Sequence, residues 1–456
     1  LKVKVKCLGW VVLRCSSQLL LVISVIKTHP VLLSQLILSC SVDTAMAPVS
    51  GAYNPEFLDD FLPLYYGKLF PIDAFYKWIT YSDKSRGGNR EISFTLRDDV
   101  YIRFQSFSNK QEFQKALKDK RPHKIDIGAV YNYSPKNHHE PSFGPTEREL
   151  VFDIDMTDYD DVRTCCQGAD ICKSCWAFMT LAMQILDRVL RDDFGFKHIL
   201  WVYSGRRGVH CWVCDARARR LRAGARAAIA SYISILKSQA QSSKKVSLFK
   251  SLHPSLRETL KIVKDYFPVI ALQNQKVLEG DKFWHDVVSA SSDNSFKDDI
   301  EKNVLSQTSC EERWEAFVAV VEKAQQKSTR YQFILEEVML ELCYPRLDVA
   351  VTKGTQHLLK APFSVHPKTG RVCVPIDIAN VMDFDPFTVP TVSQLCNEID
   401  EYDAQHKSMD VGSSAVQEYK KTGLASSVAL FQSFVDKVCL TEADVVIKKV
   451  DQSMEF

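Results

Sequence analysis

Four cysteines within eleven positions constrain the local fold of this 456-residue chain more than any other feature of its sequence. Cys165, Cys166, Cys172 and Cys175 follow the spacing CC-x5-C-x2-C, whereas most of the other cysteines are isolated in apolar or mixed surroundings. A loop this short can bring four thiolates around one ion, and four thiolates form a closed tetrahedral zinc site with no position left for water. The spacing therefore predicts one structural zinc ion in the loop of residues 165–175.

Two alternatives to that site remain open. Cys172 and Cys175 could pair with Cys211 and Cys214, or the thiols could carry no metal. If residues 209–214 form a strand, however, Cys211 and Cys214 point to opposite faces and cannot share an ion. The sequence therefore favours the compact group, with the isolated cysteines as core residues in a reducing compartment.

A predicted strand over residues 150–156 carries two acids within an otherwise apolar run. Its period of two places Asp153 and Asp155 on the same face. Two like charges side by side are costly to bury, so a compensating cation is expected, and divalent metal fits best. A lone Asp-x-Asp is also common at structural or surface positions. Asp348, in the β-prone run 346–352, is the candidate for a third metal ligand.

Two basic stretches could bind phosphate. The first brackets adjacent arginines with glycines between two predicted strands, and the second follows Asp348. Guanidinium groups suit phosphate oxygens, although a basic surface hairpin is the simpler interpretation. The candidate phosphate-binding side chains are Ser204, Arg206, Arg207, His210, His357, Lys360 and His366.

The alternation of short β-rich runs with helical segments predicts an α+β fold built on a mixed β-sheet. Residues 216–237 are expected to form one helix, whose arginines fit a solvated face better than a nucleic-acid patch. We divide the chain into a leader (1–45), a first part of the core (46–238), an inserted helical subdomain (239–328), a second part of the core (329–402), and a linker with a terminal helix (403–456).

The leader resembles a signal peptide because lysines precede apolar stretches. Charged residues and a proline interrupt those stretches, so no run reaches the roughly 18 residues of a membrane span. We expect a disordered leader or an artefact of the gene model rather than a secretion signal. A cleaner start follows Met46, where Asn54-Pro55-Glu56 is typical of a helix N-terminus.

The motifs occur in an order that closely resembles the eukaryotic DNA primase small (catalytic) subunit, of the archaeo-eukaryotic primase superfamily. The resemblance rests on Asp153-x-Asp155, the four-cysteine loop, Ser204-Gly-Arg-Arg-Gly-Val-His210, and Arg346-Leu-Asp348 followed by Lys360 and His366. It runs from about Pro55 through the terminal helix. The first 45 residues, the helical insertion and the arginine-rich stretch after Asp215 depart from it.

The resemblance implies template-directed synthesis of short RNA primers on single-stranded DNA, in a primase catalytic core flanked by helices. Asp153, Asp155 and Asp348 would hold two Mg²⁺ or Mn²⁺ ions. Glu91 matches an acid near the active site, and Arg103 and Asp126 match positions near the nucleotide. Asp126 would sense the ribose hydroxyl. The seven phosphate-binding candidates would line the triphosphate pocket.

The resemblance also implies partners: ribonucleoside triphosphates, a large primase subunit with an iron–sulfur cluster, and the catalytic and accessory subunits of DNA polymerase alpha. It implies a nuclear location and no membrane association. The chain has 58 Lys and Arg against 56 Asp and Glu, a net charge of +2. A chain that gripped DNA alone would be more basic, so we expect partners to retain the template and to support initiation.

Two other functions remain open. A primase-polymerase of the same superfamily would use deoxynucleotides in damage tolerance, which a comparison of ribo- and deoxyribonucleotide incorporation would reveal. A non-catalytic, zinc-stabilised subunit would use its acids only to pair with the arginines. Metal-dependent binding of a nucleoside triphosphate, absent after Asp153→Ala, would exclude that function.

Overall fold

The computed structural model describes residues 3–4, 10–11, 53–236, 246–248, 251–406 and 417–454. The chain divides into two compact units, residues 1–52 and 53–456. In the first unit, β1 (Val3–Lys4) pairs antiparallel with β2 (Trp10–Val11). The rest of the predicted leader lies outside the described residues.

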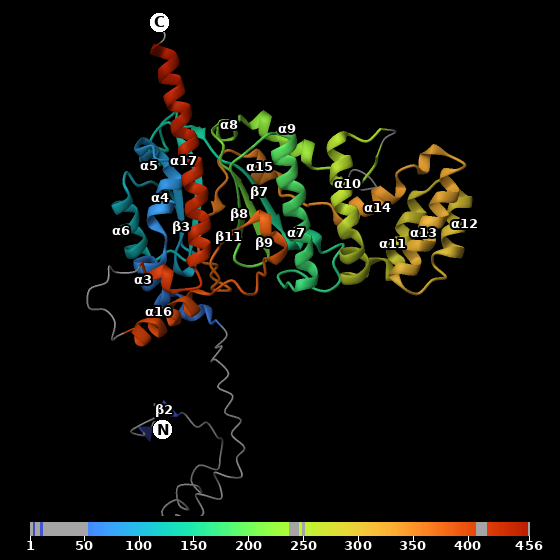
Figure 1. Ribbon diagram of the computed structural model, residues 1–456, viewed down its shortest axis with the longest axis horizontal. Helices are drawn as coiled ribbons and strands as arrows, with labels where there is room; N and C mark the ends of the chain where they lie inside the picture. The colour runs from blue at the N-terminus through green and yellow to red at the C-terminus, as the bar shows by residue number, and fades with distance from the viewer. Residues whose placement is uncertain are drawn as a thin grey trace, which may run out of the picture. The chain divides into compact units, whose positions relative to one another are not determined.

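Two antiparallel sheets form the centre of the second unit (Figure 1). The first has the order β10-β5-β3-β4, with β6 on the end of β5, and the second has the order β11-β8-β9-β7. The first contains β3 (Arg90–Thr95), β4 (Tyr101–Gln105), β5 (Lys124–Tyr131), β6 (Pro145–Glu147) and β10 (Leu359–Lys360). The second contains β7 (Leu150–Asp155), β8 (Ile199–Tyr203), β9 (Gly208–Val213) and β11 (Pro375–Ile376).

The α+β class is confirmed, but the single mixed sheet is not. Every strand pair in the described residues is antiparallel. Short turns join β3 to β4 and β8 to β9, and such turns connect antiparallel neighbours, whereas parallel strands need a long crossover.

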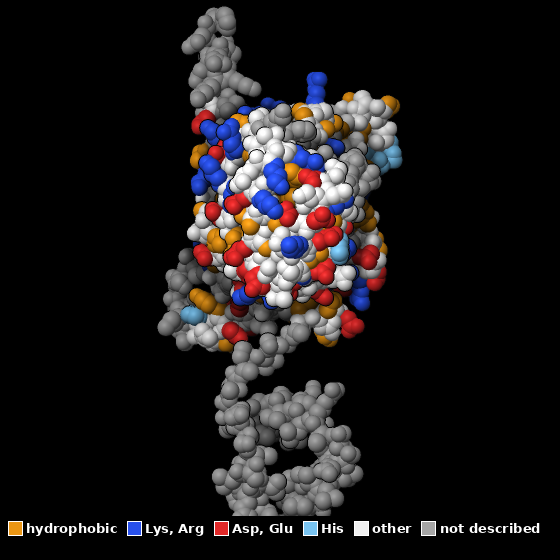
Figure 2. Space-filling view, turned by 90° about the vertical axis from the view of Figure 1, so that its right-hand side faces the viewer, with side chains coloured by type: hydrophobic (Ala, Val, Ile, Leu, Met, Phe, Trp, Pro, Cys, Tyr) orange, Lys and Arg blue, Asp and Glu red, His pale blue; other side chains and the backbone are white. Residues whose placement is uncertain are grey.

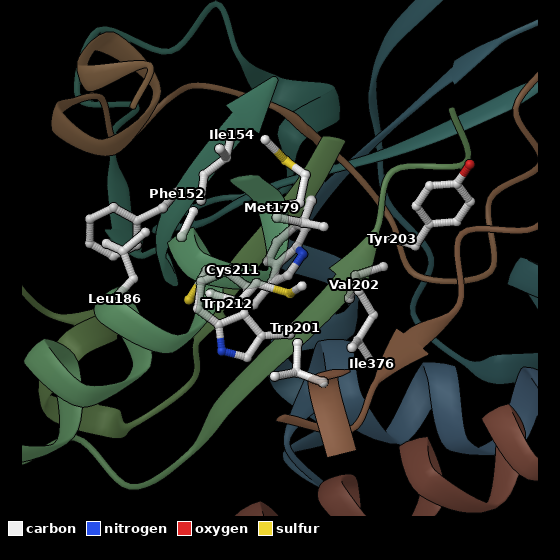
Figure 3. Close-up of a cluster of buried hydrophobic side chains, with 14 of the residues drawn as sticks. Phe152, Ile154, Met179, Leu186, Trp201, Val202, Tyr203, Cys211, Trp212 and Ile376 are labelled. Atoms are coloured by element: carbon white, nitrogen blue, oxygen red, sulfur yellow. The ribbon is translucent and has the colours of Figure 1, made fainter. Parts of the chain in front are cut away.

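The second sheet is covered by helices on both faces. Alternate residues of β7, including Phe152, face α7 (Lys173–Arg188), whose Leu186 lies beside Phe152 (Figure 3). Trp201 of β8 lies on the same face and donates to Asp187 of α7. On the opposite face, Trp212 packs edge-to-face against Trp78 of α4 (Ile72–Thr80), with ring centroids 5.2 Å apart. This second face also carries Asp153 and Asp155, because they alternate with Phe152.

Helices from the two ends of the second unit pack against each other and beside the sheets. Asn54 caps the turn Pro55–Phe57 by accepting from the backbone N–H of Glu56, as predicted. Lys77 of α4 contacts Asp436 of the terminal helix at 2.6 Å. The helices of these regions are α3 (Leu58–Leu64), α5 (Lys84–Asn89), α6 (Lys110–Lys120), α16 (Val392–His406) and α17 (Ala425–Met454).

The insertion is helical in its described part, as the sequence predicts, and lies at one end of this unit (Figure 1). It contains α10 (Pro254–Phe267), α11 (Asp281–Ala290), α12 (Asn294–Asn303) and α13 (Cys310–Gln325), and α14 (Ile334–Cys343) follows it. Acidic and basic side chains are interspersed on the face in Figure 2, in keeping with the nearly neutral net charge.

The arginine-rich segment differs from the prediction. Two helices, α8 (Ala216–Arg219) and α9 (Ala223–Ile233), replace the single helix expected over 216–237. Arg219 and Arg226 are buried rather than solvated. Arg219 pairs with Glu147 and with Glu442, each at 3.0 Å, and these distant partners cannot be read from local sequence. At the start of the predicted linker and terminal helix (403–456), residues 403–406 complete α16, and residues 407–416 lie outside the described residues.

Candidate active site

Asp153 and Asp155 lie side by side on β7, as predicted. In the register with β9 they stand opposite His210 and Gly208. The Asp153 carboxylate is 3.6 Å from Nε2 of His210. The Asp155 carboxylate accepts the backbone N–H of Thr157 at 2.9 Å, which fixes its orientation at the end of the strand.

Asp348 joins these two acids, but not from a strand. The run after it forms a short helix, α15 (Val349–Lys353), and its carboxylate caps this helix by accepting from Ala350 N at 2.9 Å. The strand prediction for 346–352 is therefore wrong, because the N-cap outweighs the β propensity of the valines. The Asp348 N–H donates to the carbonyl of Asp153 at 3.2 Å. This contact brings the third predicted ligand to β7.

The gathered acids repel each other. Burial, followed by the charges of Asp155 and Asp348, raises the pKa of Asp153 to about 6. Burial acts on Asp155 in the same direction, but hydrogen bonds from Arg207 and Thr157 outweigh it and lower the pKa of Asp155. The Nε of Arg207 lies 2.6 and 2.9 Å from the two Asp155 oxygens. One guanidinium thus offsets part of the charge of three carboxylates.

A cavity of about 320 Å³ opens between the two sheets. Its acidic wall is Asp153 and Asp155 on β7, whereas Asp348 is not among the lining residues. The basic side chains, called here the cationic wall, come from the β8–β9 turn and from the first sheet. Lys360 joins the walls: its Nζ donates to the carbonyl of Ser204 at 3.1 Å, and its own carbonyl lies 3.3 Å from Nδ1 of His210. The polar lining residues are Lys124, Asp126, Asp153, Asp155, Ser204, Arg206, Arg207, His210, Lys360 and His366.

The two histidines of the cavity are neutral near pH 7. Burial, followed by the charge of Lys360, lowers the pKa of His210 to about 3. Burial, Lys360 and Arg206 lower the pKa of His366 to about 2. The positive charge of the wall therefore comes from arginine and lysine, while the imidazoles can exchange hydrogen bonds without adding charge.

Sequence reasoning missed Lys124, which lines the cavity and contacts Asp126 at 3.0 Å. Lys124 begins β5, two residues before Asp126. Side chains at this spacing lie on the same face of a strand, so the spacing could have placed Lys124 beside Asp126. Glu91, Arg103 and His357 are not among the lining residues. Glu91 is buried in an ion pair with Arg103, and His357 is exposed.

The four predicted cysteines form a group of their own. Their Sγ atoms all lie within 4.8 Å of one another, a donor set that fits one soft or borderline metal ion. Although burial acts in the opposite direction, hydrogen bonds from the backbone of Cys175 and from neighbouring thiols lower the pKa of Cys172 to about 7. In the described residues, Cys211 and Cys214 belong to no such group.

Gln275, from the turn after α10, holds this loop in place, a role the sequence did not reveal. Its side-chain oxygen accepts the N–H of Thr164 at 2.9 Å, and its amide nitrogen donates to Sγ of Cys165 at 3.3 Å. Arg163 supports the loop from the other side by donating to the carbonyl of Asp170 at 2.8 Å. The insertion is thereby fastened to the cysteine group.

Comparisons with known proteins agree with this geometry. The sequence model described as DNA primase small subunit matches residues 152–378, a range that includes the acids and the cysteine group. The DNA primase small subunit of Drosophila melanogaster is 44% identical over 406 residues, covering 85% of this chain and 93% of the relative. The chain belongs to the DNA primase small subunit family. That of Schizosaccharomyces pombe is 40% identical, covering 78% of this chain and 81% of its own length.

Family membership makes the chain a primase-type nucleotidyltransferase. Among solved structures, the polymerase domain of Mycobacterium tuberculosis ligase D in complex with DNA covers 79% of this chain and 93% of its own, with a TM-score of 0.34 and 9% identity. A likeness at that level carries no argument about this primase subunit. No helix in the described part of the chain is long and apolar enough to cross a membrane.

Proposed function

We propose that this protein is the catalytic subunit of a DNA primase, which joins ribonucleotides into short RNA primers on single-stranded DNA to initiate replication. Membership of the primase small subunit family supports the activity. The observation that carries the mechanism is a cavity lined by the Asp153 and Asp155 carboxylates and by basic side chains, with Asp348 held next to Asp153 by a backbone hydrogen bond.

The acidic wall fits a pair of hard divalent cations. Carboxylate oxygens are the ligands that Mg²⁺ and Mn²⁺ prefer, and burial, followed by the charges of Asp155 and Asp348, raises the pKa of Asp153. Asp153, Asp155 and Asp348 would hold the two ions, which would activate the primer hydroxyl and neutralise the reacting phosphates.

The cationic wall would bind the incoming nucleotide. Arg206 and Lys360 would attract the triphosphate, while neutral His210 and His366 would orient its oxygens through hydrogen bonds. Asp126, on the neighbouring strand and held by Lys124, would accept from the ribose 2′-hydroxyl. Triphosphate and sugar would thus be fixed before the phosphate reacts.

The test is primer synthesis by the Asp348→Asn variant. Asparagine caps helices about as well as aspartate, so α15 should persist while one metal ligand loses its charge. We expect dinucleotide formation to fall by about 10³-fold or more, which corresponds to about 4 kcal/mol of transition-state stabilisation. Asp377→Asn is the matched control, because Asp377 also caps a helical turn but is not among the acids whose charges act on Asp153. Undiminished synthesis by Asp348→Asn would refute the mechanism.

The ion pair between Arg207 and Asp155 is the observation that favours a non-catalytic subunit instead. In the described residues, however, neither Asp153 nor Asp348 has an arginine or lysine within ion-pair distance. Mn²⁺-dependent binding of a ribonucleoside triphosphate, lost in Asp153→Ala, would separate the two functions. Nucleotide binding that is unchanged by removal of Mn²⁺ and by Asp153→Ala would support the non-catalytic function.

The cysteine group would hold one structural Zn²⁺, because four thiolates leave no position for water or substrate. Elemental analysis should find one zinc per chain, lost in Cys172→Ser and kept in Cys396→Ser, whose cysteine lies on α16. Gln275→Leu should keep the zinc but release it about tenfold faster to a chelator. Full zinc retention by Cys172→Ser would refute the site.

The small-subunit assignment implies a large primase subunit, and we propose the iron–sulfur subunit, the polymerase alpha complex and a nuclear location. The nearly neutral charge supports a template retained largely by partners. The isolated chain should extend primers but begin new ones poorly. Equal initiation by the isolated chain and the heterodimer would contradict this dependence.

A further inference from the structure

Four planar side chains form a column at the edge of the first sheet. The rings of Phe104 and His138 are stacked, with centroids 4.1 Å apart and planes inclined by 5°. His139 extends the column, with its ring centroid 3.8 Å from that of His138 and its plane tilted by 43°. At the Phe104 end, the Arg103 guanidinium lies over the ring at 4.7 Å. Two separate segments therefore contribute to the column: β4 and the loop between β5 and β6.

The backbone at Phe104 is held in an unusual conformation. Its φ is 56°, in the left-handed region that non-glycine residues rarely adopt, and the β3–β4 register shifts nearby. The buried Glu91 carboxylate maintains this conformation by accepting the N–H of Phe104 at 3.3 Å, Nε of Arg103 at 3.0 Å and the hydroxyl of Tyr131 at 3.0 Å. Glu91 is thus a positioning residue for the column.

The column shares the face of the first sheet that lines the cavity. Ser93 connects the cavity to β4, the strand of Arg103 and Phe104, because its hydroxyl lies 3.4 Å from the Asp126 carboxylate and 3.2 Å from the Tyr101 hydroxyl. Tyr101 is 49% exposed, and Nζ of Lys124 lies 5.9 Å from its ring centroid. Aromatic and basic side chains therefore follow one another from the cavity toward β4.

A stacked pair elsewhere shows that such geometry alone needs no ligand. Tyr402 and His406 stack at 4.0 Å and 16°. They are one turn apart on α16, where residues at this spacing meet by default. The Phe104–His138 stack instead joins two segments at a sheet edge, next to the cavity face, on a backbone that costs energy to hold.

Aromatic rings beside cations are how proteins bind single-stranded nucleic acid, since every base has a face that can stack. We propose that the column of Arg103, Phe104, His138 and His139 is a stacking surface for unpaired bases of the single-stranded DNA that leads into the cavity. This inference rests on the proposed function, which requires such a template. It assigns the column a ligand of its own, separate from the nucleotide in the cavity.

Binding of a fluorescent single-stranded oligodeoxynucleotide, in EDTA and without nucleotide, tests the column independently of catalysis. His138→Ala should weaken binding about tenfold, the size expected from losing one stacking partner. His138→Phe should restore it, because a phenyl ring keeps the stacking face. His406→Ala is the matched control and should bind like wild type.

Further binding measurements identify which part of the nucleic acid the column contacts. An oligonucleotide of abasic sites should bind wild type and His138→Ala equally, because it has no bases to stack. Phe104→Leu should weaken binding without changing the dependence on salt concentration, since no charge is removed. An oligoribonucleotide of the same sequence separates the strands: a His138→Ala loss that is larger on RNA than on DNA would assign the column to RNA and overturn the template assignment.

Unaltered DNA binding by His138→Ala, or a loss of equal size on the abasic strand, would also overturn the inference. Neither result would contradict the proposed function, because primer synthesis by the Asp348→Asn variant is measured separately. Loss of catalysis in Asp348→Asn with normal DNA binding by His138→Ala would retain the primase and reject the column.

Discussion

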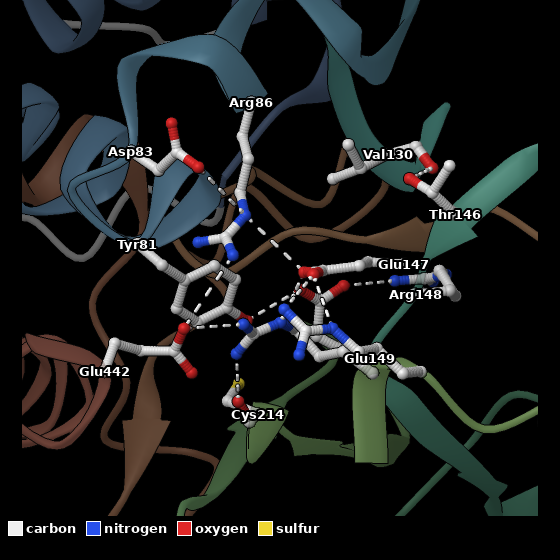
Figure 4. Close-up of polar contacts among 12 residues, drawn as sticks. Tyr81, Asp83, Arg86, Val130, Thr146, Glu147, Arg148, Glu149, Cys214 and Glu442 are labelled. Atoms are coloured by element: carbon white, nitrogen blue, oxygen red, sulfur yellow. Dashed lines mark hydrogen bonds and ion pairs between the residues drawn. The ribbon is translucent and has the colours of Figure 1, made fainter. Parts of the chain in front are cut away.

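Two clusters of buried charge lie within this protein, and they are built in opposite ways. Around Glu149, every carboxylate oxygen meets cations or donors: Arg90 at 2.9 Å, Arg148 at 3.0 Å and the Tyr81 hydroxyl at 2.6 Å (Figure 4). Around Asp153, the neighbouring groups include two more carboxylates. Both clusters are formed by residues of adjacent strands and helices.

The pKa directions express this difference. Burial raises the pKa of Glu149, but the charges of Arg90 and Arg148 outweigh it and hold the pKa well below its usual range. Burial and like charges both raise the pKa of Asp153, to about 6. A carboxylate whose charge is met by neighbouring cations serves the fold, whereas a group of carboxylates that repel one another is prepared for a ligand from outside.

The largest expected effect is on stability, from Glu149→Gln. The amide keeps the shape but leaves the buried Arg90 and Arg148 guanidinium groups without a counter-charge. We expect the free energy of unfolding to fall by about 3–5 kcal/mol, measured by denaturant titration. Asp436→Asn is the control: it breaks the exposed pair with Lys77 and should cost less than about 1 kcal/mol. A cost for Glu149→Gln no larger than the control would break the comparison.

Asp153→Asn should act in the other direction in metal-free protein. Removing one of three gathered charges should raise the free energy of unfolding at pH 8 by about 1–2 kcal/mol, while primer synthesis is lost. The comparison requires that the fold becomes more stable when this functional acid is neutralised. Destabilisation by Asp153→Asn would mean that the acidic wall is held together by partners of its own.

The pH dependence of the same two variants sharpens the contrast. The folded pKa of Asp153 lies above its unfolded value of about 3.9, so its ionisation costs stability as the pH rises from about 4 to about 6. The gain from Asp153→Asn should therefore appear over that window. The pKa of Glu149 is lowered, so its contribution is complete above its unfolded value and is lost as the pH falls below about 4. Parallel rather than opposite slopes would contradict the assignment.

Sequence periodicity predicted the parts of the site that depend on near neighbours. Alternation placed Asp153 and Asp155 on one face, and spacing gathered the four cysteines. It failed at Asp348, where one capping carboxylate converts a β-prone run into a helix. The position of Asp348 beside β7 depends on a hydrogen bond to Asp153, which is 195 residues earlier. Local sequence patterns do not indicate such a distant contact.

The charged residues that the sequence misplaced have distant partners too. Arg219 is buried because Glu442 reaches it from the terminal helix, and Gln275 reaches the cysteine loop from the insertion. Glu91 was assigned to the catalytic centre by resemblance, yet its side chain holds the β4 bulge and does not line the cavity. Residue type and spacing thus indicated which groups carry chemistry, while tertiary contacts decided which of them meet.

The smallest expected effect comes from Arg207→Gln, which probes the ion pair between Arg207 and Asp155. Both partners are partly exposed, so metal-free protein should lose less than about 1 kcal/mol. Saturating Mn²⁺ should abolish the difference in melting temperature, because bound cations take over the neutralisation of Asp155. Arg206→Gln, whose guanidinium has no carboxylate within ion-pair distance in the described residues, should show no such metal dependence. A cost of several kcal/mol that Mn²⁺ leaves unchanged would place Asp155 in the same class as Glu149 and favour the non-catalytic alternative.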